Sequence, residues 1–375
     1  MSPRKICFVL PSLNGGGAER AAVNILNALD PAAWDRSMYL FRREGPYLDA
    51  LEPSIRLISG AVDSRSGRWL ALRRFLRATR PNLVVSFLSY FTVLTAARAA
   101  GIGARVVFNQ QTPMSAFLDD ADYPWRQPWH RHAFELATRI GYRQADAIVT
   151  TSAGVADDLV ARFGVAGDRI SVLHNPVDLA SIAAASAEPL DRAHDWLWTH
   201  PAIVAAGRLA DAKNYPLLFD AFALVRKRLA AKLFVLGEGE REAALREHVD
   251  RLGLGGSVVF CGFQRNPWRY IARADVFALS SRYEGFGNVL IEAMACGVPV
   301  VATSSPGTRE IVRSGVDGLL VDVHEPAALA GALERLLRDE ALRRRMSEEA
   351  RRRAVAFAVP AIAAAYGQMF AEAVA

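Results

Sequence analysis

Short apolar runs alternate along the chain with segments whose apolar residues recur at helical spacing. In the first half the runs cover residues 6–10, 38–41, 83–87, 106–108 and 147–150. The pattern starts again in the second half, at residues 202–206, 232–236, 257–261, 276–279, 298–302 and 318–321. Strands that alternate with amphipathic helices predict parallel sheets covered by helices, so we expect an α/β fold.

The length of the chain and a change of composition near its middle predict two domains. Its 375 residues exceed the roughly 250–300 at which a single core stops growing. His174, Asn175 and Pro176 precede a stretch rich in small residues, 180–189, which has the composition of a linker. We therefore expect one domain over residues 1–176 and a second over residues 177–358.

The C-terminal tail predicts two further helical segments. Residues 327–355 show helical spacing with a break near Asp339, and Pro360 precedes a last segment over residues 361–373. Because proline suits the first turn of a helix, we expect residues 359–375 to form a separate helix.

Composition and the N-terminal residues are typical of a folded protein of the cytosol. Hydrophobic residues make up 51% of the chain and charged residues 22%, which argues against disorder. The apolar run at 6–10 lacks the length of a signal peptide, and the stretch 84–97 is shorter than the roughly 20 residues that cross a bilayer. Cys7, Cys261 and Cys296 stand far apart among apolar neighbours, which predicts reduced thiols rather than disulfides or metal ligands.

The positive charge of the chain lies in its first half. The formal net charge is +6, and residues 1–176 carry 21 Lys and Arg against 15 Asp and Glu. Such an excess fits an anionic acceptor, a phospholipid surface or a solvated face, and no nucleic-acid-binding motif accompanies it. Segment 65–77 interleaves arginines with apolar residues, which predicts either a membrane-surface helix or a core-facing helix with a solvated basic side.

A glycine-rich turn follows the first predicted strand. Gly15, Gly16 and Gly17 let the backbone approach a ligand closely, and the N-terminus of the next helix favours a phosphate. A nicotinamide-dinucleotide site would place a third glycine where Arg20 stands and an acidic residue where Arg42 and Arg43 stand. These departures argue against a dehydrogenase, although paired arginines leave an NADP-dependent oxidoreductase as an alternative.

Two cations follow the first strand of the second domain. Arg208 and Lys213 lie five residues apart in the turn that begins at Gly207. Because ligands of open α/β sheets bind at the carboxyl ends of strands, we expect this pair to clamp a diphosphate. Two ordinary surface cations are the alternative interpretation.

The segment from Ser280 to Pro299 predicts a strand end, a glycine loop and one short helix. Asn288 suits the N-cap and Gly297 suits the C-terminal stop, so free main-chain amides follow Glu284 and suit a phosphate. We expect Glu292 to accept hydrogen bonds from the hydroxyls of a ribose. We expect Glu284 to accept hydrogen bonds from the hydroxyls of a sugar at the other end of the diphosphate. Two solvated glutamates beside a capped helix are the plainer alternative.

Taken together, these motifs resemble the retaining GT-B glycosyltransferases of family GT4, over nearly the whole chain. The resemblance implies two Rossmann-like domains that face a central cleft, with a final helix that crosses back to the first domain. It assigns catalytic roles to Arg208, Lys213 and Glu284. It also implies a set of donor-binding residues: Gly16, Gly17, Gly207, Gly262, Phe263, Gly285, Phe286, Gly287, Asn288, Val289, Leu290 and Glu292.

The resemblance also implies a reaction and its partners. A hexose or N-acetylhexosamine would pass from a nucleotide sugar, with UDP favoured and GDP left open, to a saccharide or lipid-linked saccharide acceptor. Residues 1–176 would bind the acceptor and residues 177–358 the donor. No metal or other cofactor is expected, and the enzyme would work in the cytoplasm, at the inner face of the membrane where the acceptor is lipid-linked.

One departure from the family pattern and two rival functions remain. Some relatives carry a histidine or an acidic residue in the loop after the strand at 106–108, where this chain has Asn109, Gln110 and Gln111. Asp120 and Asp122 would suit a divalent cation in a metal-dependent GT-A enzyme. A non-enzymatic protein that binds an anionic membrane surface through its basic half is the other rival.

Overall fold

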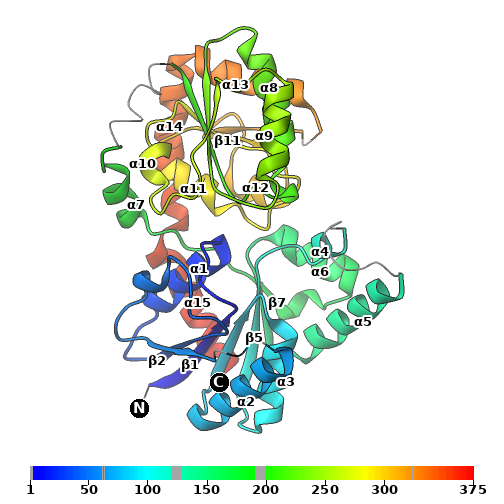
Figure 1. Ribbon diagram of the computed structural model, residues 1–375. Helices are drawn as coiled ribbons and strands as arrows, with labels where there is room; N and C mark the ends of the chain where they lie inside the picture. Colours follow the sequence, from blue (N-terminus) through cyan, green and yellow to red (C-terminus); the bar gives the residue numbers. More distant parts are fainter. Residues whose placement is uncertain (1–2, 61, 63, 120–127, 191–199, 323) are drawn as a thin grey trace. The chain divides into compact units, whose positions relative to one another are not determined.

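A computed structural model of the protein describes residues 3–60, 62, 64–119, 128–190, 200–322 and 324–375. The chain divides into two compact units (Figure 1). Unit 1 comprises Met1–Pro176 together with Val359–Ala375, and unit 2 comprises Val177–Ala358. The first and last residues of unit 2 lie next to each other. The amide of Val177 donates to the carbonyl of Phe357 at 2.8 Å, and Val177 forms a parallel bridge with Ala358.

Unit 1 contains a parallel sheet of seven strands in the order β3-β2-β1-β4-β5-β6-β7. The strands are β1 (Arg4–Leu10), β2 (Trp34–Leu40), β3 (Arg56–Ser59), β4 (Leu83–Phe87), β5 (Arg105–Gln110), β6 (Ala147–Thr150) and β7 (Ile170–Val172). The described helices are α1 (Gly17–Ala28), α2 (Arg65–Thr79), α3 (Tyr90–Ala100), α4 (Ala116–Asp119), α5 (Pro128–Gln144), α6 (Ala153–Phe163) and α15 (Val359–Ala373).

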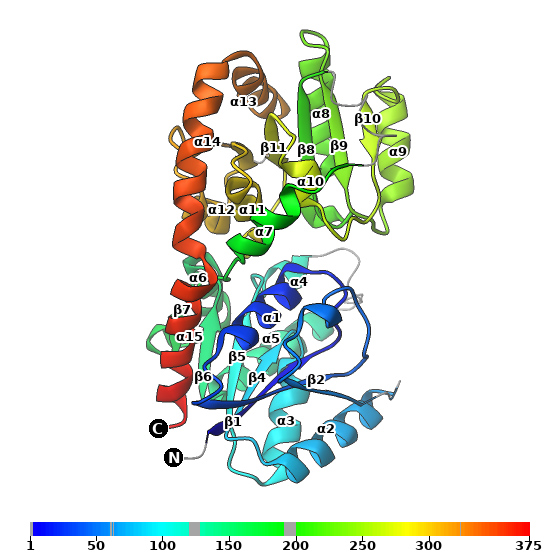
Figure 2. The ribbon, with the colours of Figure 1, turned by 90° about the vertical axis from the view of Figure 1, so that its left-hand side faces the viewer.

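Both faces of this sheet are buried under helices. Cys7 and Val9 of β1 pack with α2, α3, α5 and α6, whereas Ile6, Phe8 and Leu10 pack with α1 and α15. This alternation follows from the two-residue period of a strand, and it explains why β1 reads as a continuous apolar run. Figure 2 shows α15 beside α1 in unit 1, as expected for a final helix that returns to the first domain.

The helix predicted over 65–77 is α2, and its apolar side faces the core of unit 1. Leu72 and Leu76 are buried, and Trp69 and Phe75 pack against the same cluster. Ser64 caps the helix by accepting a hydrogen bond from the amide of Gly67. The arginines of α2 therefore form the solvated side of a core-facing helix.

Unit 2 contains a parallel sheet of six strands in the order β10-β9-β8-β11-β12-β13. The strands are β8 (Ala202–Ala206), β9 (Lys232–Leu236), β10 (Val258–Phe260), β11 (Val276–Leu279), β12 (Val300–Thr303) and β13 (Gly318–Val321). Helices α8 (Tyr215–Arg226), α9 (Glu242–Arg251) and α13 (Pro326–Arg338) cover one face. The other face is covered by α7 (Leu179–Ser186), α10 (Trp268–Ile271), α11 (Asn288–Ala295) and α12 (Pro306–Ile311), and α14 (Glu340–Ala354) contributes to both clusters.

Both sheets are parallel and lie between helices, so the predicted α/β class is confirmed. The predicted break near Asp339 is also present, because Asp339 accepts from the amide of Leu342 and begins α14. The linker interpretation of residues 180–189 is wrong for most of the stretch. Asp178 caps a short helix there, α7, whose alanines favour the helical state and whose Ile182 is buried.

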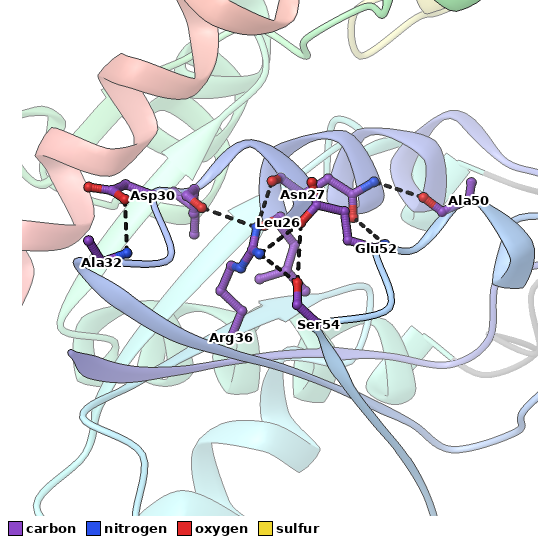
Figure 3. A network of polar contacts seen from close by, with 9 residues as sticks. Leu26, Asn27, Asp30, Ala32, Arg36, Ala50, Glu52 and Ser54 are labelled. Atoms are coloured by element: carbon purple, nitrogen blue, oxygen red, sulfur yellow. Dashed lines mark hydrogen bonds and ion pairs between the residues drawn. The ribbon is translucent and has the colours of Figure 1, made fainter.

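Arg36 on β2 holds the C-terminal end of α1 (Figure 3). Its guanidinium is almost completely buried, and its Nη1 donates to three main-chain carbonyls at 2.6–3.2 Å, those of Leu26, Asn27 and Leu29. Its Nη2 donates to Glu52 Oε2 at 2.7 Å and to Ser54 Oγ at 2.9 Å. The last carbonyls of a helix have no partner within the helix, so this side chain supplies the missing donors.

We expect Arg36→Met to destabilise the protein by about 3 kcal/mol, because it leaves buried carbonyls without donors. The matched control is Arg56→Met, which removes an exposed ion pair to Asp35 and should cost less than about 1 kcal/mol. Urea unfolding midpoints of the two variants measure the difference. Equal midpoints would mean that the Arg36 network contributes no more than a surface pair.

Candidate donor site

The predicted site residues of unit 2 gather at the carboxyl ends of its central strands. The strand order reverses between β8 and β11, which are neighbours in the sheet. Lys213 follows β8 and Glu284 follows β11. Ligands of open parallel sheets bind at such a switch point, so the topology brings the two halves of the predicted site together.

Lys213 and Glu284 are in direct contact. The Nζ of Lys213 lies 2.5 Å from Oε1 of Glu284, and their side chains are only 24% and 11% exposed. Seventy-one residues separate them along the chain. A partly buried lysine paired with a carboxylate can bind a ligand anion with its remaining donors.

Hydrogen bonds from neighbouring serines fix this pair. Ser281 Oγ donates to Glu284 Oε1 at 2.6 Å, and Ser280 Oγ donates to the carbonyl of Lys213 at 2.9 Å. The amide of Arg282 also donates to the carbonyl of Ala212 at 2.9 Å. Sequence reasoning missed both serines, although their position at the end of a buried strand marks them as candidates.

Arg208 is the outer cation of the predicted clamp. Its side chain is 73% exposed, and its Nη2 lies 3.0 Å from Oε2 of Glu240. A surface pair of this kind is weak and exchanges readily for a stronger anion. Each predicted cation thus has a carboxylate partner in the structure.

Tyr215 supports the turn that carries both cations. Its hydroxyl donates to the carbonyl of Gly207 at 3.1 Å. Burial, together with the nearby charge of Glu284, raises the pKa of Tyr215, so the phenol stays protonated as a donor. Gly207 itself has a φ of 156°, and an added Cβ would lie 3.3 Å from Cε of Lys213. The glycine therefore leaves room for the lysine stem.

The start of α11 differs from the prediction by one residue. Gly287, with a φ of 98°, occupies the N-cap, and Asn288 is the first helical residue. A positive φ suits glycine, which explains why the asparagine is displaced from the cap. The main-chain amides of this first turn follow Glu284 directly, as the prediction requires.

Three of the predicted donor-binding residues also contribute side chains to the core of unit 2. Phe286 and Leu290 are buried, and Val289 packs against the same cluster. Phe286 makes an edge contact with Phe357 at 5.5 Å between ring centroids. The main-chain amides of these residues stay candidates for binding a phosphate.

Gly307, which sequence reasoning missed, lies against the loop that contains Glu284 and Gly285. A Cβ at Gly307 would come within 2.7 Å of the carbonyl oxygen of Glu284 and 2.8 Å of that of Gly285. The residue therefore has to be glycine for the loop to hold its position. The Pro306-Gly307 pair at the start of α12 was the available signal.

Glu292, the predicted ribose ligand, is buried on α11. Its Oε2 accepts a hydrogen bond from Nε1 of Trp268 at 2.9 Å. The indole therefore fixes the orientation of the carboxylate. Trp268 could not be predicted from the sequence, because α10 and α11 come together only in the folded protein.

Gly262 and Phe263 lie at the end of β10, beside the loop after β9. The amide of Gly237 donates to the carbonyl of Gly262 at 2.8 Å, and the amide of Phe263 donates to Glu238 Oε1 at 3.2 Å. Phe263 exposes its ring to solvent. An exposed aromatic ring beside main-chain groups suits a planar base, and Glu238 is a further residue that sequence reasoning missed.

Gly16 and Gly17 lie in unit 1, where they begin α1 after β1. Gly16 is the N-cap, and a Cβ there would lie 2.3 Å from Oε2 of Glu19. Burial raises the pKa of Glu19, whose carboxylate folds over the glycine. The strand order of unit 1 reverses between β1 and β4, so this turn also lies at a switch point.

The amides that replace the family's histidine or acidic residue are structural. Asn109 donates to the hydroxyl of Tyr366, and Gln111 donates to Oδ1 of Asn109. Asn175 donates to Oε1 of Gln111 at 2.9 Å. These buried groups tie β5 to α15 and provide no proton acceptor for a substrate.

The candidate metal ligands Asp120 and Asp122 lie outside the described residues. Within the described ranges, no group of three or more His, Cys, Asp or Glu side chains is placed to hold a metal ion. None of the helices that the structure describes is long and apolar enough to span a bilayer.

Sequence comparisons identify relatives for both halves of the chain. A profile described as Glycosyltransferase Family 4 matches residues 15–181, and one described as Glycosyl transferases group 1 matches residues 189–353. A relative from Campylobacter jejuni, N-acetylgalactosamine-N,N'-diacetylbacillosaminyl-diphospho-undecaprenol 4-alpha-N-acetylgalactosaminyltransferase, is 31% identical over 94% of this chain and 96% of its own length. The chain belongs to glycosyltransferase family 4.

A second relative of this glycosyltransferase is the lipopolysaccharide core biosynthesis glycosyltransferase LpsE of Rhizobium meliloti. It is 32% identical over 65% of this chain and 72% of its own length. Membership of an enzyme family sets aside both the oxidoreductase and the non-enzymatic alternatives.

Solved structures share the fold of the glycosyltransferase. HepE from Anabaena, in complex with UDP-glucose, has a TM-score of 0.80 at 20% identity and covers 98% of this chain and 99% of its own. WaaG, a glycosyltransferase involved in lipopolysaccharide biosynthesis, has a TM-score of 0.76 at 18% identity and covers 97% and 99%. The fold is GT-B, with two Rossmann-like domains, so the GT-A alternative is set aside.

We expect the thiols near the site of the glycosyltransferase to react slowly. Burial raises the pKa of Cys261 to about 11, and burial with the charge of Glu292 raises the pKa of Cys296 to about 12. A raised pKa keeps each thiol protonated until the pH rises past that value. A thiolate-specific reagent at pH 8 should therefore modify the folded protein about a hundredfold more slowly than the unfolded protein. Equal rates would contradict the burial of these thiols.

Proposed function

We propose that the enzyme transfers a hexose or N-acetylhexosamine from a UDP-sugar to a saccharide or lipid-linked saccharide, with retention of anomeric configuration. The contact between Lys213 and Glu284 at the switch point of unit 2 is the observation that carries this proposal. A lysine and a carboxylate side by side match the two parts of a nucleotide sugar, the anionic diphosphate and the hydroxyl-rich ring. No other cation of the described residues has this position in the sheet of unit 2 together with this degree of burial.

The donor diphosphate would exchange partners with the acids that now hold the cations. Lys213 and Arg208 would bind the phosphates, since a diphosphate carries more charge than a single carboxylate. Once Lys213 binds the phosphates, Glu284 would accept hydrogen bonds from hydroxyls of the donor sugar. The hydrogen bond from Ser281 would keep the carboxylate of Glu284 in place. The amides at the start of α11 would face the same phosphates.

Retention follows from chemistry on one face of the sugar. The bond between the anomeric carbon and the diphosphate breaks as the acceptor oxygen bonds to the same face. The proton of the acceptor hydroxyl passes to an oxygen of the departing diphosphate. Positive charge from Arg208 and Lys213 stabilises the leaving group, so the proposal needs neither a metal nor a protein nucleophile.

The nature of the partners is inferred from relatives. HepE was solved with UDP-glucose, which supports UDP as the donor nucleotide. The Campylobacter jejuni relative is named for an acceptor on diphospho-undecaprenol, which supports a lipid-linked saccharide and work at the inner face of the membrane. In this scheme unit 2 binds the donor, and the basic residues 1–176 bind the anionic acceptor.

Thermal unfolding in the presence of nucleotides tests the donor. We expect UDP to stabilise the protein by about 2.7 kcal/mol at a hundred times its dissociation constant, a shift of several degrees. GDP, ADP and NADPH at the same concentration, each with EDTA, are the matched controls. A shift with GDP alone would mean that the donor is a GDP-sugar rather than a UDP-sugar. A shift with UDP that disappears in EDTA would overturn the metal-free mechanism.

Replacement of Lys213 tests the clamp. We expect Lys213→Ala to lose about 3 kcal/mol of transition-state stabilisation, a fall in kcat of more than a hundredfold. The thermal midpoint should also fall by several degrees, because Glu284 loses its cation partner, so activity is measured well below that midpoint. Lys227→Ala, at an exposed position of unit 2, is the control and should keep full activity.

Release of UDP from UDP-sugars in the presence of acceptor measures both variants. An active Lys213→Ala enzyme would remove Lys213 from the mechanism. Loss of activity in Lys227→Ala would show that any loss of positive charge in unit 2 is harmful, and the clamp would then have no special role.

A further inference from the structure

Helix α5 of unit 1 presents large apolar side chains to solvent. Trp129, Leu136 and Ile140 are 62%, 59% and 47% exposed. Their spacing of seven and four residues places them on one side of the helix, since seven residues make two turns. We call these three residues the α5 ridge.

The fold of unit 1 does not need the α5 ridge. The opposite side of α5 supplies the core, where Thr138, Gly141 and Tyr142 are buried and Phe134 packs against the cluster. At Gly141 an added Cβ would lie 2.2 Å from the ring of Phe91, so this side already fits closely against α3. The helix is thus apolar on two opposite sides, and among the residues that the structure describes only the side with Thr138 and Tyr142 packs into a core.

Positive charge borders the α5 ridge. Arg139 and Arg143 are exposed, and the spacing of four residues places them along one flank of the ridge. The single acidic residue of α5 is Glu135, which lies 3.5 Å from Arg131 and 3.7 Å from His132. Arg139 also reaches α6, where it donates to the carbonyl of Arg162. Large apolar side chains with a basic border are typical of helices that lie in the interface of an anionic bilayer.

We propose that one side of α5, a helix labelled in Figure 1, is the surface by which the enzyme binds an anionic lipid bilayer. This side consists of the α5 ridge with Arg139 and Arg143. This inference rests on the membrane partner of the proposed function and names the surface that meets it. Helix α2 carries more arginines, but its large apolar residues pack into the core of unit 1 with the exception of Leu70. Charge alone attracts a protein to a bilayer, whereas α5 adds side chains that can enter it.

A second copy of the chain is a poorer occupant of the same surface. Two copies related by a twofold axis would bring their ridges together along with their own arginines. Such like charges repel, whereas the phosphates of an anionic lipid neutralise them. The charge pattern therefore favours lipid over self-association.

Co-sedimentation with vesicles tests the surface without donor or acceptor. The full-length protein is mixed with phosphatidylcholine vesicles that contain or lack phosphatidylglycerol. We expect binding only to the anionic vesicles, and we expect the triple variant Trp129→Ser, Leu136→Ser and Ile140→Ser to bind at least about tenfold more weakly. Arg139→Glu with Arg143→Glu should have the same effect. UDP-induced thermal stabilisation of these variants should equal that of the wild type, which separates this test from that of the donor site.

The matched controls lie on α2. Leu70→Ser removes its exposed leucine, and Arg74→Glu with Arg77→Glu reverses two exposed charges without touching the core. We expect the leucine variant to bind as the wild type does and the charge variant to lose less than the α5 charge variant. Equal losses from both charge variants would overturn the assignment to α5, and so would a wild type that stays in the supernatant. A dimer in sedimentation velocity that the triple serine variant turns into a monomer would assign the ridge to self-association.

Discussion

The ion pair between Lys213 and Glu284 is the contact on which the arrangement of the candidate donor site depends. It joins the end of β8 to the end of β11, and these strands are neighbours only because the sheet order reverses there. Water is largely excluded from both side chains, so the pair is stronger than a surface pair and its geometry is fixed. Ser280 donates a hydrogen bond to the carbonyl of Lys213, and Ser281 donates one to the carboxylate of Glu284. The ion pair and the loop after β11 are therefore held together.

The paired state of the cations has a further effect on recognition. In the proposed function a ligand displaces the carboxylate partners of Arg208 and Lys213, and this exchange favours a ligand with more than one negative charge. A monovalent anion gains little from such an exchange, whereas a diphosphate gains at both positions. Selection for a diphosphate can thus arise from the acids beside the cations as well as from the cations.

The sequence predicted the central strands and the main site residues because both have local signatures. Strands buried on both faces read as apolar runs, whereas β3 and β7 at the sheet edge are half exposed and lack that signature. Lys213 and Glu284 were predicted from their place after strands. Trp268, Glu238 and the role of Gly307 were not, because each acts on a residue from another strand or helix. Such contacts depend on the order of the strands, which no local pattern contains.

Unit 2 is inserted into unit 1, and its two ends are hydrogen bonded to each other at Val177 and Phe357. Helix α15 of unit 1 follows unit 2 in the chain, so it leaves the ribosome after unit 2, and it supplies Tyr366 and Phe370 to the core beneath α1. Synthesis therefore delivers every residue of the inner unit before the outer one is complete. Folding in the order of synthesis is the usual course, but here the domain that begins first has to finish last.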